Sequence, residues 1–111
     1  MPPALPDWKT PGAVWMFKED LVVVINDQRY CSVNKDRGCA IGRGISSLPR
    51  EVYKAHARPA TVIDIMDAIN LLYKEIADRK YLGDYLSQRT MVRQQLFKEA
   101  LATLEQGIEN E

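Results

Sequence analysis

The hydrophobic pattern of the chain changes its period near residue 45, and this change constrains the fold most strongly. Before residue 45, apolar residues form short runs between turn signals, and the β-branched run at 21–25 is the strongest strand pattern. After residue 45, apolar residues recur every three or four positions, as on one face of a helix. Strand patterns followed by helix patterns predict an α+β fold. We expect a small antiparallel β-meander over about 13–42, then a short helix and a long α-helical hairpin over about 62–80 and 85–106.

The strand patterns predict a meander with short connections. Residues 21–25 are apolar throughout, so we expect a central strand that is covered by helix on at least one face. Turn signals follow at Asn26-Asp27 and at residues 34–38, where Gly38 accepts the positive φ that closes a bulged hairpin. The meander has three strands, or four if residues 39–41 form a short strand.

The helical half contains start and stop signals. Pro59 ends the short helix, and Thr61 with Asp64 three residues later resembles a capping box for the helix that follows. We expect the second long helix, over about 85–106, to end near Gly107. A single long helix that runs through Gly83 remains an alternative, because one glycine inside a helix costs only about 1 kcal/mol. The predicted core stripe of the first long helix is Val62, Ile65, Met66, Ile69, Leu72, Tyr73 and Ile76.

The length of 111 residues predicts a single domain over 1–111. Residues 1–12 hold four of the six prolines and are expected to form an extended arm, on which Trp8 either pins the arm to the domain or reaches a partner. Residues 108–111 are expected to be a frayed acidic tail. The sequence shows neither an apolar run of about 20 residues nor a secretory signal, so we expect no membrane insertion and a cytoplasmic location.

Residue types that carry catalysis or bind metals are sparse. Cys31 and Cys39 form no Cys-x-x-Cys pair, and the single histidine, His56, has no metal-ligand spacing to them. The glycines near Gly42 lack the Gly-Lys-Ser/Thr ending of a phosphate-binding loop. We therefore expect no catalytic residues, no metal and no cofactor. Whether the two cysteines can form a disulfide depends on the hairpin register.

The distribution of charge is uneven although the net charge is zero. The chain has 15 basic and 15 acidic residues, which excludes a strongly basic nucleic-acid binder. Residues 28–58, however, contain seven basic and two acidic residues, a local net charge of +5 between acidic flanks. The candidate contacts to an anion or to an acidic partner are Arg37, Arg43, Arg50, Lys54 and Arg58.

The helical hairpin has more apolar residues than a small sheet can cover. Arg89 and Arg93 lie among the apolar residues of its second helix. The candidate partner or dimer face is Trp8, Leu71, Tyr81, Leu82 and Tyr85. These features predict a non-enzymatic interaction protein, a regulator, inhibitor or adaptor that binds another protein, as small phage and accessory-element proteins often do. A homodimer through the helices is possible on this basis, and the alternative function is a nucleic-acid-binding module that uses the basic segment 28–58.

Overall fold

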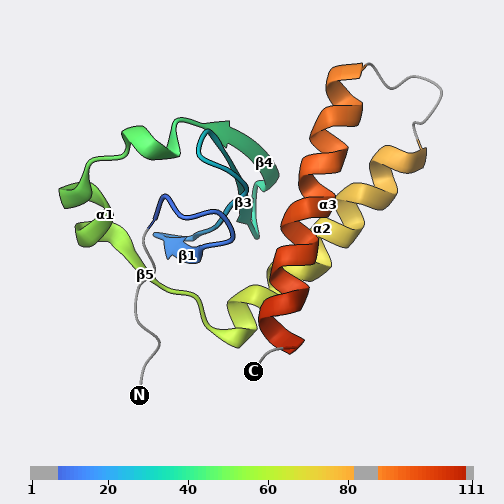
Figure 1. Ribbon diagram of the computed structural model, residues 1–111. Coiled ribbons are helices and arrows are strands. Elements are labelled where there is room, and N and C mark those ends of the chain that lie inside the picture. The colour runs from blue at the N-terminus through green and yellow to red at the C-terminus, as the bar shows by residue number, and fades with distance from the viewer. Residues whose placement is uncertain (1–7, 82–87, 110–111) are drawn as a thin grey trace.

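The computed structural model describes residues 8–81 and 88–109 and confirms the predicted α+β fold. Its described strands form one antiparallel sheet with the order β4-β3-β2-β1-β5 (Figure 1). The strands are β1 (Val14–Phe17), β2 (Asp20–Val24), β3 (Arg29–Asn34), β4 (Gly38–Arg43) and β5 (Ala57–Pro59). The helices are the 3-10 helix η1 (Ile45–Ser47), α1 (Arg50–His56), α2 (Val62–Tyr81) and α3 (Gln88–Glu109).

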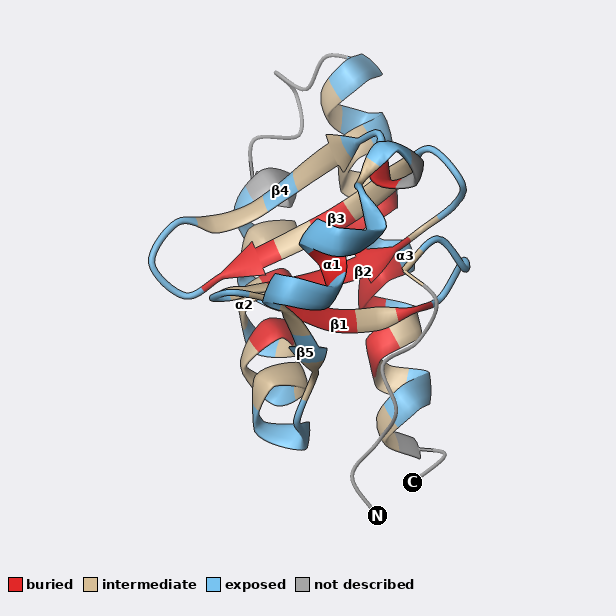
Figure 2. Cartoon of the chain, turned by 90° about the vertical axis from the view of Figure 1, so that its left-hand side faces the viewer, coloured by how far each residue is buried: buried red, intermediate tan, exposed pale blue. Residues whose placement is uncertain are grey.

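The central strand β2 is covered on both faces, as its unbroken apolar run predicts. Leu21 and Val23 belong to a core cluster that the sheet shares with α2 and α3. Val22 and Val24 face the other way, into a second cluster that contains Trp15 and Tyr53 of α1. Figure 1 shows the resulting three layers, with α2 and α3 on one side of the sheet and α1 on the other. Burial accordingly concentrates along the inner strands (Figure 2).

The sheet has one strand more than the sequence predicted. The fourth strand forms, but the chain then adds β5, which pairs with β1 through Phe17↔Ala57 and Trp15↔Pro59. Pro59 does not itself end α1, because the helix ends at His56 and Ala57 already belongs to β5. Pro59 sits in that strand, which is tolerated because β5 lies at the edge of the sheet. A three-residue strand is too short to show the alternation by which strands are recognised.

The core face of α2 is rotated from the predicted stripe. Ile65, Ile69, Leu72 and Ile76 pack into the core as expected, together with Ala68. Val62, Met66 and Tyr73, which the sequence placed on the same face, are exposed. The predicted stripe was therefore wider than the face of α2 that enters the core, and the exposed Tyr73 donates its hydroxyl to Glu105 of α3 instead.

The bounds of α3 differ from the prediction at its C-terminal end. The helix continues through Gly107 to Glu109, so residues 108 and 109 belong to the helix rather than to a frayed tail. An isolated glycine is tolerated in a helix at a cost of about 1 kcal/mol. The predicted break at Gly83, and the question of one long helix, lie outside the described residues. On either side of that gap, α2 and α3 run in opposite directions, as a hairpin requires (Figure 1).

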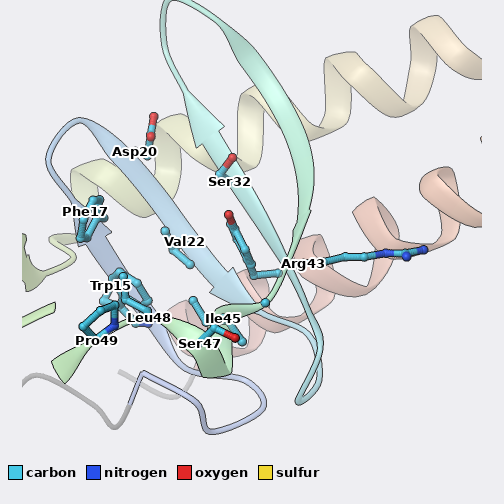
Figure 3. A pocket seen from close by; sticks show the side chains of 12 residues that line it. Trp15, Phe17, Asp20, Val22, Ser32, Arg43, Ile45, Ser47, Leu48 and Pro49 are labelled. Carbon is cyan, nitrogen blue, oxygen red and sulfur yellow. The ribbon is translucent and has the colours of Figure 1, made fainter. Parts of the chain in front are cut away.

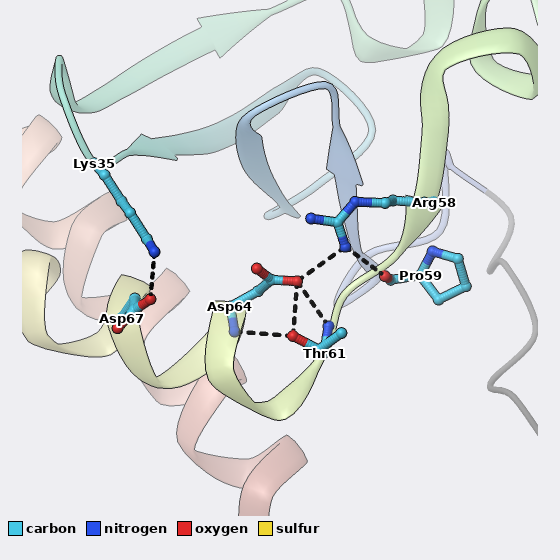
Figure 4. A network of polar contacts seen from close by, with 6 residues as sticks. All are labelled: Lys35, Arg58, Pro59, Thr61, Asp64 and Asp67. Atoms are coloured by element: carbon cyan, nitrogen blue, oxygen red, sulfur yellow. Dashed lines mark hydrogen bonds and ion pairs between the residues drawn. The ribbon is translucent and has the colours of Figure 1, made fainter.

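A polar network fixes the start of α2 and confirms the predicted capping box (Figure 4). The Asp64 N–H donates to Thr61 Oγ1 over 3.1 Å, and the Thr61 N–H donates to Asp64 Oδ2 over 3.0 Å. Arg58 of β5 donates to the same carboxylate oxygen over 3.1 Å. Burial alone would raise the pKa of Asp64, but the hydrogen bonds from Thr61 and Arg58 outweigh it and hold that pKa below its usual range. Lys35 also pairs with Asp67 over 2.8 Å, so the β3–β4 turn is tied to α2.

Candidate anion-binding site

The five basic residues that the sequence singled out do not share one site. Arg37 pairs with Asp20 over 3.3 Å and Arg58 pairs with Asp64, so both have carboxylate partners. Arg50 and Lys54 are exposed on α1. Only Arg43, at the end of β4, lines a groove with other arginines.

That groove, which we call the arginine groove, lies between the ends of β3 and β4 and the first turns of α3. It is lined by Arg29, Arg43, Arg89 and Arg93, with Ile41, Val92 and Leu96 between them. Its volume is about 540 Å³. Four of the eight arginines of the chain therefore converge on one surface, and no lysine and no carboxylate is among the described residues that line it.

The local structure places these charges close together at an energetic cost. The sheet register sets Arg29 directly opposite Arg43, and like charges in such a cross-strand pair destabilise a sheet. Arg89 and Arg93 are four residues apart on α3, where like charges also repel each other. The groove therefore holds two pairs of like charges, neither of which stabilises the fold.

Arg93 is half-buried where the groove meets the core. Its guanidinium carbon is 5.9 Å from the centre of the Phe97 ring, and its buried Nε–H has no hydrogen-bond acceptor among the described residues. Burial raises the pKa of the nearby Cys31 thiol far above its usual range, and Cys39 raises it further, although Arg93 lowers it in part. The thiol therefore stays neutral and does not compensate the charge of Arg93. Glu75 of α2 also influences this thiol, but it is not one of the residues that line the groove.

A second concavity, the aromatic hollow, lies on the sheet face turned away from α2 and α3. It encloses about 380 Å³ between the strands and the connector 44–49 (Figure 3). Its walls include Trp15, Phe17, Val22, Tyr30 and Leu48. Arg43 lines both the hollow and the arginine groove, so the two concavities adjoin at the end of β4.

The groove was missed because half of it comes from a distant segment. The segment 28–58, with its local charge of +5, contains both Arg43 and Arg29. Arg89 and Arg93 belong to a segment of net negative charge and reach the groove only because α3 packs back on the sheet. Their spacing of four residues on a predicted helix was the one signal that could have indicated a shared face.

The described residues of the predicted partner face lie in different parts of the structure. Leu71 is half-buried against the core between the sheet and the helices. Trp8 packs on Tyr53 with a ring separation of 4.9 Å, which favours the interpretation that Trp8 pins the N-terminal arm. The side chain of Tyr81, and the whole of Leu82 and Tyr85, lie outside the described residues.

The cysteines carry no bridge in this structure. The register pairs Cys31 with Ile41 and Cys39 with Val33, so the two cysteines are offset by two positions across the β3–β4 hairpin. Neither cysteine forms a disulfide. Within residues 8–81 and 88–109, no group of three or more His, Cys, Asp and Glu side chains could hold a metal ion. None of the described helices is long and apolar enough to cross a membrane.

Comparisons with protein-family models, with curated proteins and with solved structures find no match to this chain. Its function is therefore inferred from its own residues and their geometry.

Proposed function

We propose that this protein is a non-enzymatic binding protein that holds nucleic acid through the arginine groove. The observation that carries this proposal is the convergence of Arg29, Arg43, Arg89 and Arg93 from two strands and a helix. Guanidinium groups present planar, bidentate donors that match phosphate oxygens better than an ammonium group does. A nucleic acid offers a row of such phosphates, and each contact releases condensed counterions, which adds to the affinity.

The zero net charge of the chain fits a local contact rather than a long-range attraction. Acidic residues elsewhere, such as Asp20, Asp64 and Asp67, are paired with their own basic neighbours away from the groove. The described residues that line the groove are therefore basic or apolar although the whole chain is neutral. Moderate affinity at physiological salt, on the order of 10 µM, is what a few phosphate contacts without base recognition supply.

The salt dependence of binding tests this proposal. Fluorescence anisotropy with a labelled oligonucleotide should show binding at low salt, with an affinity that falls linearly in a plot of log K against log salt. Three to four phosphate contacts predict a slope of about −2 to −4. Polyglutamate of matched charge serves as the acidic-protein control and should compete weakly. Absence of binding at low salt, or equal competition by polyglutamate, would overturn the assignment to nucleic acid.

A second candidate function, binding to another protein, is favoured by exposed apolar side chains on α2. Ile63, Met66 and Tyr73 recur at helical spacing and are 70%, 53% and 52% exposed, and the Tyr73 hydroxyl donates to Glu105 of α3. If the partner is a second copy of this chain, light scattering should give a mass near twice 12.7 kDa. Ile63→Glu combined with Met66→Glu should return the mass to that of the monomer. A monomeric wild type at high concentration would exclude the homodimer.

A further inference from the structure

The aromatic hollow has the size and lining of a site for one flat, mostly apolar group. Its volume of about 380 Å³ lies in the range of small-molecule sites and exceeds what a single nucleobase needs. Phe17 of β1 and Tyr30 of β3 are half-buried and contribute aromatic surface, and Leu48 and Pro49 contribute apolar surface. Partly exposed rings of this kind stack on unpaired bases with little dependence on sequence, whereas Trp15 also lines the hollow but is almost fully buried.

Polar groups at the hollow suit the edge of a base. The hydroxyls of Ser32 and Ser47 line it and can donate or accept hydrogen bonds. The carboxylate of Asp20 also lines the hollow but already accepts hydrogen bonds from Asn34 and Arg37. The Trp15 side chain is 1% exposed, and its indole N–H has no acceptor among the described residues.

Arg43 connects the hollow to the arginine groove. In Figure 3 its side chain extends away from the hollow, and its guanidinium ends on the side of the sheet where α3 lies. The guanidinium lines the groove with Arg89 and Arg93 of α3. In a nucleotide, the base and its phosphate are separated by one sugar, so a site for an unpaired base has to adjoin a site for phosphate. Arg43 lines both concavities and lies at the end of the edge strand β4, where a nucleic-acid strand would pass from one face of the sheet to the other.

We propose that the protein prefers single-stranded nucleic acid, with one unpaired base in the aromatic hollow and the flanking phosphates in the arginine groove. This inference rests on the proposed function, because it uses the same groove for phosphate. The bases of a duplex are paired and stacked, so a duplex reaches the groove with its phosphates but leaves the hollow empty unless a base is flipped out.

Three oligonucleotide probes of equal length separate the roles of base and phosphate. The first is a short oligothymidylate, the second is the same strand without bases, and the third is a duplex. Anisotropy should show the oligothymidylate binding about 10-fold more tightly than the abasic strand, as expected for the stacking of one base. Equal affinities for the oligothymidylate and abasic strands, or tighter binding of the duplex, would overturn the base site while the groove stands. If none of the three probes binds, the proposed function fails as well.

Tryptophan fluorescence reports on the hollow directly. The chain has two tryptophans, so Trp8→Phe leaves Trp15 as the sole tryptophan. The ring centres of Trp8 and Tyr53 are 4.9 Å apart, and phenylalanine at position 8 retains an aromatic ring against Tyr53. The oligothymidylate should change the Trp15 emission, and the abasic strand at equal occupancy should not. The same change with both strands would contradict a base in the hollow.

A substitution that fills the hollow provides the variant that tests the base site. Ser32→Leu places a larger apolar side chain into the hollow from a half-buried strand position. Its affinity for the oligothymidylate should fall to that for the abasic strand, whereas its affinity for the abasic strand should not change. Unchanged discrimination between the strands in a folded Ser32→Leu variant would overturn the proposal. If this variant does not fold, the Trp15 emission of the Trp8→Phe protein still tests whether a base enters the hollow.

Discussion

Reversing two charges of the arginine groove, by Arg43→Glu together with Arg89→Glu, is expected to lower the affinity for an oligonucleotide by about 100-fold or more. Each arginine supplies a charge-assisted hydrogen bond to phosphate, which contributes about 1.5–3 kcal/mol, and each glutamate adds repulsion. The slope of log K against log salt should also become shallower by about 2, because two phosphate contacts are lost. Anisotropy titrations at several salt concentrations measure both effects.

The matched control changes the net charge by the same amount at another place. Arg50→Glu together with Lys54→Glu alters two exposed basic residues of α1 that the sequence analysis also singled out. Neither residue lines the arginine groove. The control should therefore bind within about 5-fold of the wild type, since only the overall field has changed. Equal losses in the two variants would show that the net charge, and not the groove, determines binding.

The groove variant also separates binding from folding. Glutamate at position 43 faces Arg29 across the β3–β4 pair, and glutamate at position 89 lies four residues before Arg93 on α3. Both changes replace a repulsive pair with an attractive one. The free energy of unfolding should rise by a few tenths of a kcal/mol for the helical pair and by up to about 1 kcal/mol for the cross-strand pair. The melting temperature should therefore equal or exceed that of the wild type. A large loss of stability would mean that these arginines hold the fold together.

The parts of the structure that the sequence predicted correctly are those fixed by local chemistry. The β-branched run at 21–25 leads to a buried central strand. The predicted turn at residues 34–38 forms, and Gly38 adopts a φ of 83° because glycine has no Cβ that would clash in this conformation. Thr61 and Asp64 form a capping box because both partners lie within three residues of each other. Such signals need no knowledge of the tertiary structure.

The arginine groove could not be predicted in the same way. Arg29 faces Arg43 only in the register that the β3–β4 turn sets, and a shift by one residue would place them on opposite faces. Arg93 joins them only through the packing of α3 on the sheet. The exposed stripe at Ile63, Met66 and Tyr73 has the same origin, because the position of α3 decides which side of α2 is covered. These features depend on contacts between residues far apart in the sequence.

Replacing Phe97 with alanine is expected to lower the free energy of unfolding by about 3–5 kcal/mol. Phe97 of α3 is 0% exposed and belongs to the core cluster that joins the helices to the sheet, with Leu72 of α2 and Cys31 of β3. Its removal loses transfer free energy and leaves a cavity that the surrounding strands and helices cannot close. Because domains of this size are stable by about 5–15 kcal/mol, the loss should be a large fraction of the total. Urea unfolding followed by circular dichroism measures it as a lower midpoint at an unchanged slope.

The adjacent residue provides the control for this substitution. Lys98 is exposed on α3, so Lys98→Ala should change the free energy of unfolding by no more than about 0.5 kcal/mol. Phe97 lies one turn beyond Arg93 and holds that part of α3 against the sheet. Conditions that partly unfold Phe97→Ala should therefore separate Arg89 and Arg93 from Arg29 and Arg43 and abolish binding to the oligonucleotide. A cost below about 1 kcal/mol for Phe97→Ala would contradict the packing of α3 on the sheet, and with it the convergence of the four arginines.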